Sequence, residues 1–459
     1  MSVEKERYQK LMLSPTSILR AEPQYYGAYI IFDSKWTRTE FLKEVEFRAL
    51  KYISEKVASV EEIATQVGME YEACLRLMER MMKLKYILPL DDLSNAVYPP
   101  KKLPVNSEWY THFLLPFLSA PSSVDIFVTN RCNLKCIHCY SNGGDGETHD
   151  LSLNDLEHIF EQLESVGVLE VRINGGEPLL HPQIAEIFLA LQKRRFRKVL
   201  LTNGTNITEE TATLLKEAEI IPTVSLDDSD EEEHDRFRGV KGSFKRTIEA
   251  LTILQKKRVQ YGINCCLHRN NLHRSRDIID LAVAQGASRI AFLDLKNMGR
   301  LKKHEQWFPS YGEYEKIRRE LEFVKFKSRQ KIDVSLDVFL HCQPLRESKL
   351  EAQKGYISCQ AGKNRLSIDS DGSVYPCNLV LSDPMWRFGN IKNEDILGIW
   401  FSQKWSIFRG DMRINDLPHC KTCKNLKKCS DFYCRLLPYI TTGDLYNSHP
   451  RCNKGSNQL

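Results

Sequence analysis

The chain has 459 residues, 42% of them hydrophobic, and a formal net charge of +5 from 65 basic and 60 acidic residues. This length allows two to four domains, and so mild a charge gives no reason to expect a nucleic-acid partner. No apolar run approaches the roughly 18 residues of a membrane span, and the charged start MSVEKERYQK lacks the apolar core of a secretory signal. We therefore expect a cytoplasmic protein without a membrane partner. Metal or cluster binding explains a count of 14 cysteines better than a disulfide framework does, because the cytoplasm is reducing.

Residues 1–95 predict a small domain. It begins with a β-prone stretch, YYGAYIIF at 25–32, and continues with three helix patterns. The first helix is expected near 44–57 and the third over 70–87, while the second opens with Ser59 and Glu62, an S-x-x-E capping box. Five prolines between 99 and 121 then indicate a linker over residues 96–121.

Residues 122–310 alternate between strand and helix patterns. Amphipathic helices are expected between the strands, for example over 153–166 and 244–257. The predicted strands cover 124–129, 170–174, 198–202, 221–226, 261–267 and 289–295. Such alternation indicates right-handed βαβ units and a parallel sheet, so the fold class is α/β. A charged helix is expected to lead out over 311–340, and the acidic run 227–233 is expected to be a solvated loop.

A cysteine cluster follows the first strand of this region. Cys132, Cys136 and Cys139 lie in VTNRCNLKCIHCY. Three thiolates can hold three irons of a [4Fe–4S] cluster and leave the fourth iron open for a small molecule. Three clustered cysteines could instead bind zinc or be thiols packed in a core. The position of the cysteines directly after a strand favours an active site, because α/β barrels place their active sites at the carboxyl ends of the strands.

The C-x3-C-x2-C spacing resembles the signature of the radical S-adenosylmethionine (SAM) superfamily, with His138 at a position that is often aromatic. The second strand ends in NGGEP, which resembles the GGE motif of that family. By resemblance, Gly175, Gly176 and Glu177 would hold the amino group of the SAM methionine. The chemistry fits, since glycines allow close backbone approach and a carboxylate pairs with an ammonium. The resemblance implies a partial (β/α)6 TIM-type barrel.

The fourth strand ends in Ser225-Leu226-Asp227. Family members use residues at this place to bind the ribose hydroxyls of SAM, so Ser225 and Asp227 are candidates, with polar capping of a loop as the other interpretation. The segments HDRFRGVKGSF (234–244) and MGR (298–300) resemble stretches of the SPASM subgroup, without an assigned role.

Residues 341–459 contain eight of the cysteines. Their spacing resembles the seven-cysteine SPASM signature, except that four residues separate Cys429 from Cys434 where three are usual. The resemblance implies one or two auxiliary [4Fe–4S] clusters, with a zinc ribbon as the alternative. The first would take Cys359, Cys377 and Cys434, with Cys342 as a fourth ligand or an open site; the second would take Cys420, Cys423, Cys429 and Cys452. Cys74, Cys265 and Cys266 are expected to be packed thiols.

The resemblance also implies an activity. The SAM-binding cluster would split SAM and generate a 5′-deoxyadenosyl radical, which abstracts hydrogen from a substrate. The N-terminal pattern resembles the PqqD-like winged-helix element that grips the leader of a precursor peptide; a DNA-binding winged helix or a structural cap are alternatives. The three regions together resemble sactipeptide maturases, which form intramolecular Cys thioethers in bacteriocin-type peptides. A reductant such as flavodoxin or ferredoxin would be a partner.

Other products remain open: C–C crosslinks, β- or γ-thioethers, decarboxylation, or sulfatase-type maturation. Asn378 argues against the last, because anaerobic sulfatase maturases carry an Asp base there and a neutral amide cannot accept the proton. The sequence identifies no catalytic base. The hypothesis of another class is a binding protein with a winged helix and zinc ribbons.

Overall fold

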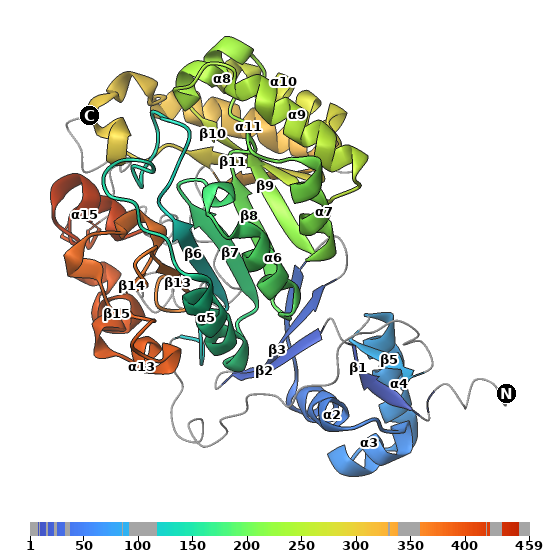
Figure 1. The fold of residues 1–459 in the computed structure, drawn as a ribbon. Helices are drawn as coiled ribbons and strands as arrows, with labels where there is room; N and C mark the ends of the chain where they lie inside the picture. Colours follow the sequence, from blue (N-terminus) through green and yellow to red (C-terminus); the bar gives the residue numbers. More distant parts are fainter. Residues whose placement is uncertain are drawn as a thin grey trace. The chain divides into compact units, whose positions relative to one another are not determined.

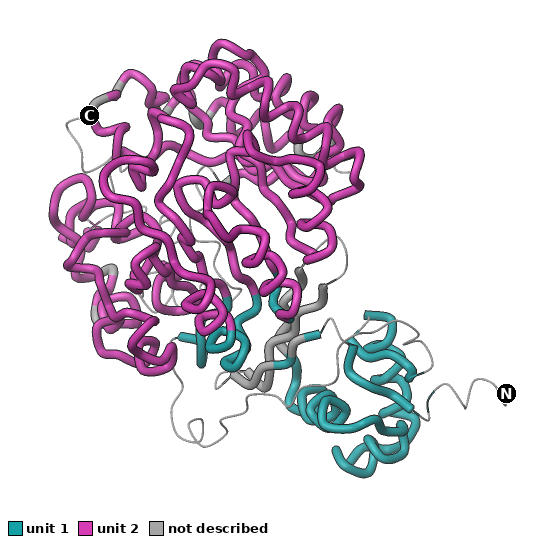
Figure 2. Tube along the Cα trace, in the orientation of Figure 1, with its two compact units in different colours: residues 1–122, 161–169, 195–197 teal, residues 123–160, 170–194, 198–459 magenta. Residues whose placement is uncertain are grey.

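The computed structural model describes most of residues 8–448. Outside the description lie 1–7, 9, 15–16, 23–24, 33–36, 85, 91–116, 329–330, 338–358, 419, 423–433 and 449–459. The chain divides into two compact units (Figure 2). The first comprises residues 1–122, 161–169 and 195–197, and the second the remainder. The division expected from the sequence, into residues 1–95, 96–121, 122–310, 311–340 and 341–459, stays a prediction.

The first unit combines three helices with two small sheets. The strands β2 (Ser17–Glu22), β3 (Tyr25–Phe32) and β4 (Thr37–Phe41) form an antiparallel sheet in that order, while β1 (Leu11–Leu13) pairs with β5 (Ile87–Pro89). The helices are α2 (Glu44–Glu55), α3 (Val60–Val67) and α4 (Tyr71–Lys83). Their apolar faces share one core.

Local sequence signals account for these helices. The predicted capping box is confirmed, because Ser59 Oγ accepts from the Glu62 N–H at 3.2 Å and Glu62 Oε2 accepts from the Ser59 N–H at 2.8 Å. The third helix ends at Lys83, earlier than predicted, because residues 87–89 leave it to pair with β1.

The second unit is built on a ten-stranded, mostly parallel sheet. The six predicted strands are confirmed at Ser123–Thr129 (β6), Glu170–Gly175 (β7), Arg197–Thr202 (β8), Ile220–Ser225 (β9), Gly262–Leu267 (β10) and Arg289–Asp294 (β11). They lie side by side in chain order, each parallel to the next, as in a partial barrel (Figure 1). Two unforeseen strands extend the sheet in parallel, β12 (Asp333–Asp337) beside β11 and β13 (Arg365–Ile368) beside β6.

Helices connect these strands as the βαβ pattern requires. They are α5 (Leu153–Ser165), α6 (Ile184–Gln192), α7 (Glu209–Glu217), α8 (Glu231–Arg238), α9 (Ser243–Lys256), α10 (Ser275–Ala284) and α11 (Tyr311–Ser328). None of the helices in the described ranges has the length and apolar composition needed to cross a bilayer.

The acidic run does not form the expected solvated loop. Its last residues begin α8, whose amino end is capped by Asp230, and Asp227 and Asp228 are 0% exposed. Each buried carboxylate is paired with an arginine: Asp227 with Arg238 and Asp228 with Arg274, both at 2.6 Å. The prediction was wrong because these pairs supply the compensation that a buried charge needs.

The C-terminal region adds two short antiparallel strands to the sheet, β14 (Ser373–Tyr375) and β15 (Gly389–Asn390), followed by α13 (Ile396–Trp400) and α15 (Leu436–Thr442). Three tryptophans of this region, Trp386, Trp400 and Trp405, are almost fully buried, and the rings of Trp400 and Trp405 pack together with centroids 5.6 Å apart.

Candidate active site

The predicted cluster cysteines lie in a loop that follows β6. Cys132, Cys136 and Cys139 are all free thiols, and Cys136 is buried. Burial, together with the neighbouring sulfurs of Cys136 and Cys139, raises the pKa of Cys132 to about 11. Burial raises the pKa of Cys136 as well, so these two thiols do not ionise readily by themselves, whereas a bound metal deprotonates a coordinating thiol outright. The donor set therefore fits an iron–sulfur cluster.

The glycines of NGGEP bring the end of β7 into contact with this loop. A Cβ atom on Gly176 would lie 2.3 Å from the Arg131 carbonyl oxygen and 2.7 Å from that of Asn130. On the loop side, a Cβ on Gly143 would lie 2.9 Å from the Gly176 Cα. Two backbones thus meet where only glycine fits, and the motif shapes the cysteine loop itself.

Arg300 and Asp145 fasten the far side of the loop. The Arg300 backbone N–H donates to the Cys139 carbonyl at 3.1 Å, and its guanidinium donates to the Gly143 carbonyl at 2.8 Å and to Asp145 Oδ2 at 2.6 Å. Lys135 Nζ pairs with the other oxygen of Asp145 at 2.7 Å. The MGR segment, which had no assigned role, therefore holds the cysteine loop.

The Glu177 carboxylate is fully buried and has protein partners on both oxygens. Oε1 accepts from Thr202 Oγ1 at 2.7 Å and from the Leu179 N–H at 3.1 Å, while Oε2 accepts from the Asn203 N–H at 2.7 Å. Burial raises the pKa of Glu177 despite these donors. This carboxylate ties the ends of β7 and β8 together; its contact with the SAM amino group stays a prediction, as do those of Gly175 and Gly176.

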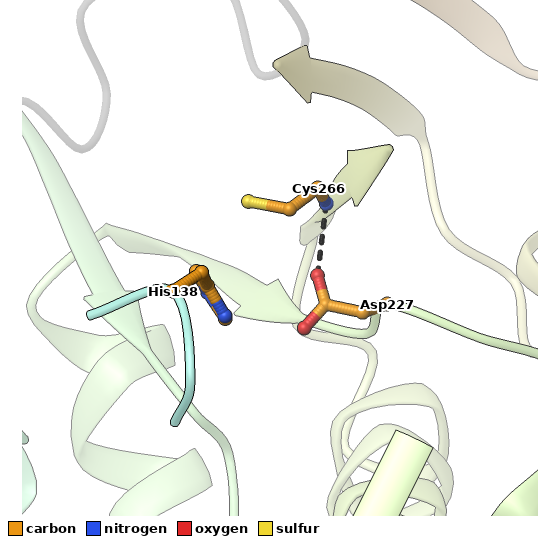
Figure 3. A group of neighbouring side chains, drawn as sticks. All are labelled: His138, Asp227 and Cys266. Atoms are coloured by element: carbon orange, nitrogen blue, oxygen red, sulfur yellow. Dashed lines mark hydrogen bonds between the residues drawn. The ribbon is translucent and has the colours of Figure 1, made fainter. Parts of the chain in front are cut away.

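The buried Asp227 lies beside the partly buried His138 and Cys266, and the candidate ligand atoms of the three are within 4.8 Å of one another (Figure 3). Asp227 Oδ1 accepts from the Cys266 backbone N–H at 2.8 Å, and Oδ2 lies 2.6 Å from Arg238 Nε. Burial raises the pKa of Asp227, but the Arg238 charge, the two neighbouring histidines and the Cys266 N–H together outweigh it, so the net shift is downward. A cation here would have to compete with the guanidinium, so we assign no metal to this group.

His138 is neutral at physiological pH, since burial lowers its pKa to about 4. Its ring stacks on Phe237 with centroids 4.2 Å apart. Ser225 ends β9 and is partly buried, whereas the Asp227 carboxylate is fully buried and already has protein partners. Binding of ribose by these two residues stays a prediction.

The auxiliary cysteines fall partly outside the description. Cys359, Cys377, Cys420 and Cys434 are described, and all but Cys377 are buried. Cys342, Cys423, Cys429 and Cys452 lie outside the described residues.

The segment after β14 connects to the first cysteine loop. Asn378 Nδ2 donates to the Tyr140 hydroxyl at 3.1 Å, which joins the neighbour of Cys377 to the neighbour of Cys139. Burial raises the pKa of Tyr140 well above its ordinary range, so the phenol stays protonated. Sequence reasoning missed this contact.

The three leftover cysteines behave as packed thiols to different degrees. Cys74 and Cys265 are 0% exposed, whereas Cys266 is partly exposed and packs against the apolar cluster around Phe237.

Comparison with known proteins identifies two domains. Residues 126–282 match the radical SAM superfamily model, and residues 359–424 match SPASM, an iron–sulfur cluster-binding domain. The chain carries a radical SAM domain followed by a SPASM domain. Radical SAM proteins with SPASM domains use S-adenosylmethionine, a [4Fe–4S] cluster that binds it, and auxiliary clusters. The first model covers the cysteine loop, NGGEP and the Asp227–Arg238 pair.

The proteins to which the chain is similar differ in their named activities. An AdoMet-dependent heme synthase of Methanosarcina barkeri is 28% identical, over 74% of this chain and 98% of that protein. The mycofactocin maturase MftC of Mycobacterium tuberculosis is 26% identical, over 74% of this chain and 85% of its own length. The crystal structure of Streptococcus suis SuiB bound to the precursor peptide SuiA superposes with a TM-score of 0.73 at 19% identity, covering 96% of this chain and 99% of SuiB.

Proposed function

We propose that this radical SAM enzyme modifies a ribosomally made precursor peptide whose leader is bound by the first unit. The observation that supports the proposal most is the extent of the structural likeness. The SuiB fold accounts for 96% of the chain, whereas the heme synthase alignment uses 98% of that relative but only 74% of this chain. Most of the residues that the heme synthase alignment leaves out are therefore covered by the fold of SuiB, which binds a precursor peptide.

The first unit offers a place for a leader. In the order β2-β3-β4, the outer strands β2 and β4 each have one neighbour among the described strands. A peptide can bind at such an edge by adding a strand, with main-chain hydrogen bonds supplying affinity and side-chain pockets supplying specificity. Three helices, α2 to α4, follow this sheet, in the order of elements that led us to expect a PqqD-like domain, and this supports the proposal.

The second unit supplies the chemistry. When bound, the [4Fe–4S] cluster and SAM supply a 5′-deoxyadenosyl radical that abstracts a hydrogen atom from the substrate. Cys132, Cys136 and Cys139 would hold the cluster. The residues that would bind SAM are Gly175, Gly176, Glu177, Ser225 and Asp227. An electron donor of the flavodoxin or ferredoxin type completes the proposal.

We propose an intramolecular Cys thioether as the product. Cys359, Cys377 and Cys434 would provide three ligands for the first auxiliary cluster. If Cys342 does not supply the fourth, the open iron could bind a substrate thiolate, and this supports the proposal. Asn378 donates to Tyr140 and cannot act as a base, which speaks against sulfatase-type maturation.

The test is co-expression with a short neighbouring reading frame that encodes a leader peptide. A thioether removes two hydrogens per bridge and protects the cysteine from alkylation, both of which mass spectrometry measures. A C–C crosslink or a β- or γ-thioether would also remove two hydrogens, and decarboxylation would remove CO₂; fragment spectra distinguish these products. A peptide of unchanged mass, with a Cys132→Ala enzyme as the blank, would reject the pairing.

The heme synthase relative supports a second candidate, a tetrapyrrole substrate. A porphyrin titration followed by absorbance separates the two. Tight, saturable porphyrin binding without peptide modification would favour the second candidate over the first.

A further inference from the structure

We propose that Arg238 sets the reduction potential of the cluster held by Cys132, Cys136 and Cys139, and that Asp227 is the positioning residue that holds Arg238 there. Arg238 Nη1 points its N–H at the Cys136 sulfur at 3.8 Å, while Nε pairs with Asp227 Oδ2 at 2.6 Å. The Arg238 side chain is 8% exposed and that of Asp227 is 0% exposed. This inference rests on the radical SAM domain and not on the proposed peptide substrate.

Backbone contacts fix the guanidinium against this cysteine. The last residues of α8 accept from the loop on both sides of Cys136: the Lys135 N–H donates to the Arg238 carbonyl at 3.2 Å, and the Ile137 N–H donates to the Phe237 carbonyl at 3.0 Å. Gly239 follows with a φ of +73°, where a Cβ would lie 2.3 Å from the Lys135 carbonyl oxygen. The helix end and the cysteine loop therefore form one locked unit.

The direction of the effect follows from charge. Reduction adds a negative charge to a cluster, and hydrogen bonds to the sulfurs together with the local net charge set its potential. The positive charge of a buried guanidinium stabilises the reduced cluster strongly, because little water screens the charge. Asp227 offsets part of this charge but fixes its place. Arg300, by contrast, directs its donors to the Cys136 and Gly143 carbonyls and to Asp145.

The experiment is an EPR-monitored redox titration of the reconstituted full chain without SAM, so that a lost SAM contact cannot change the result. A Cys132→Ala, Cys136→Ala, Cys139→Ala variant supplies the signal of the auxiliary clusters for subtraction. Arg236→Gln is the matched control, because it removes the same charge from the same helix at a side chain that is 54% exposed and pairs with Glu233.

We expect Arg238→Gln to make reduction at least tenfold less favourable, a negative shift of about 59 mV for one electron. The reduction potential of Arg238→Lys should lie between those of Arg238→Gln and the parent, and the potential of Arg236→Gln should equal that of the parent. Arg238→Gln with a full iron complement and the parental potential would overturn the proposal. If Arg238→Gln loses the cluster, Arg238→Lys decides: a negative shift supports tuning, whereas a parental potential or loss of iron leaves only a structural role.

Discussion

Replacing Glu177 by glutamine tests whether the GGEP carboxylate stabilises the fold or serves only to bind SAM. In the structure this carboxylate accepts three hydrogen bonds, from Thr202 Oγ1 and the backbone N–H groups of Leu179 and Asn203. The amide oxygen of glutamine can keep the two partners of Oε1. The amide nitrogen would then face the Asn203 N–H, so one donor is left buried without an acceptor. Such a loss costs about 1–3 kcal/mol.

The assay is urea unfolding of the protein without cluster or SAM, followed by far-UV circular dichroism. We expect Glu177→Gln to lower the unfolding free energy of the second unit by about 2 kcal/mol. Glu186→Gln on α6 is the control, since Glu186 is exposed and its replacement should change stability by less than about 0.5 kcal/mol. An unchanged midpoint for Glu177→Gln, with weaker SAM binding after reconstitution, would refute the structural role.

Three further perturbations test the same geometry. Gly176→Ala should destabilise the cysteine loop by about 1–3 kcal/mol and reduce iron uptake, because its Cβ would meet the loop at 2.3 Å, whereas Gly312→Ala, with nothing within 4 Å, should take up iron like the parent. Asp235 accepts from Ser243 Oγ and the Gly242 and Phe244 N–H groups, and although burial raises its pKa these donors lower it on balance. Its stabilisation is therefore present above the unfolded-state pKa and is lost as pH falls through the folded-state value, so urea midpoints of Asp235→Asn and parent should differ at pH 7 and converge in acid. Tyr140→Phe and Asn378→Leu should each cost stability, and their double-mutant cycle should give a coupling of about 0.5–1.5 kcal/mol; additive losses would mean that their hydrogen bond contributes nothing.

Local patterns in the sequence were sufficient for much of the fold. The six parallel strands were predictable because buried apolar runs alternated with amphipathic helices, and the Ser59 capping box fixed one helix start. Strands β12 and β13 were not predictable in this way. They are short, and each is defined only by pairing with a strand already in the sheet, β12 with β11 and β13 with β6.

The cysteine spacing and NGGEP located the candidate site, but not the contacts that organise it. Asp227 was expected to be solvated because charge runs usually are, yet the arginine that compensates it lies on the following helix. The Tyr140–Asn378 hydrogen bond joins residues 238 positions apart, and no local signal reports such a contact. The HDRFRG and MGR segments were visible as motifs, and only the fold shows that they hold the cysteine loop.

The most direct test of the whole account is the yield of 5′-deoxyadenosine from anaerobically reconstituted protein treated with dithionite and SAM. We expect turnover by the parent, with roughly twelve irons per chain if all three clusters fill. The Cys132→Ala, Cys136→Ala, Cys139→Ala variant should lose about four irons and all of the product. Equal 5′-deoxyadenosine from parent and variant would contradict the assignment of these cysteines.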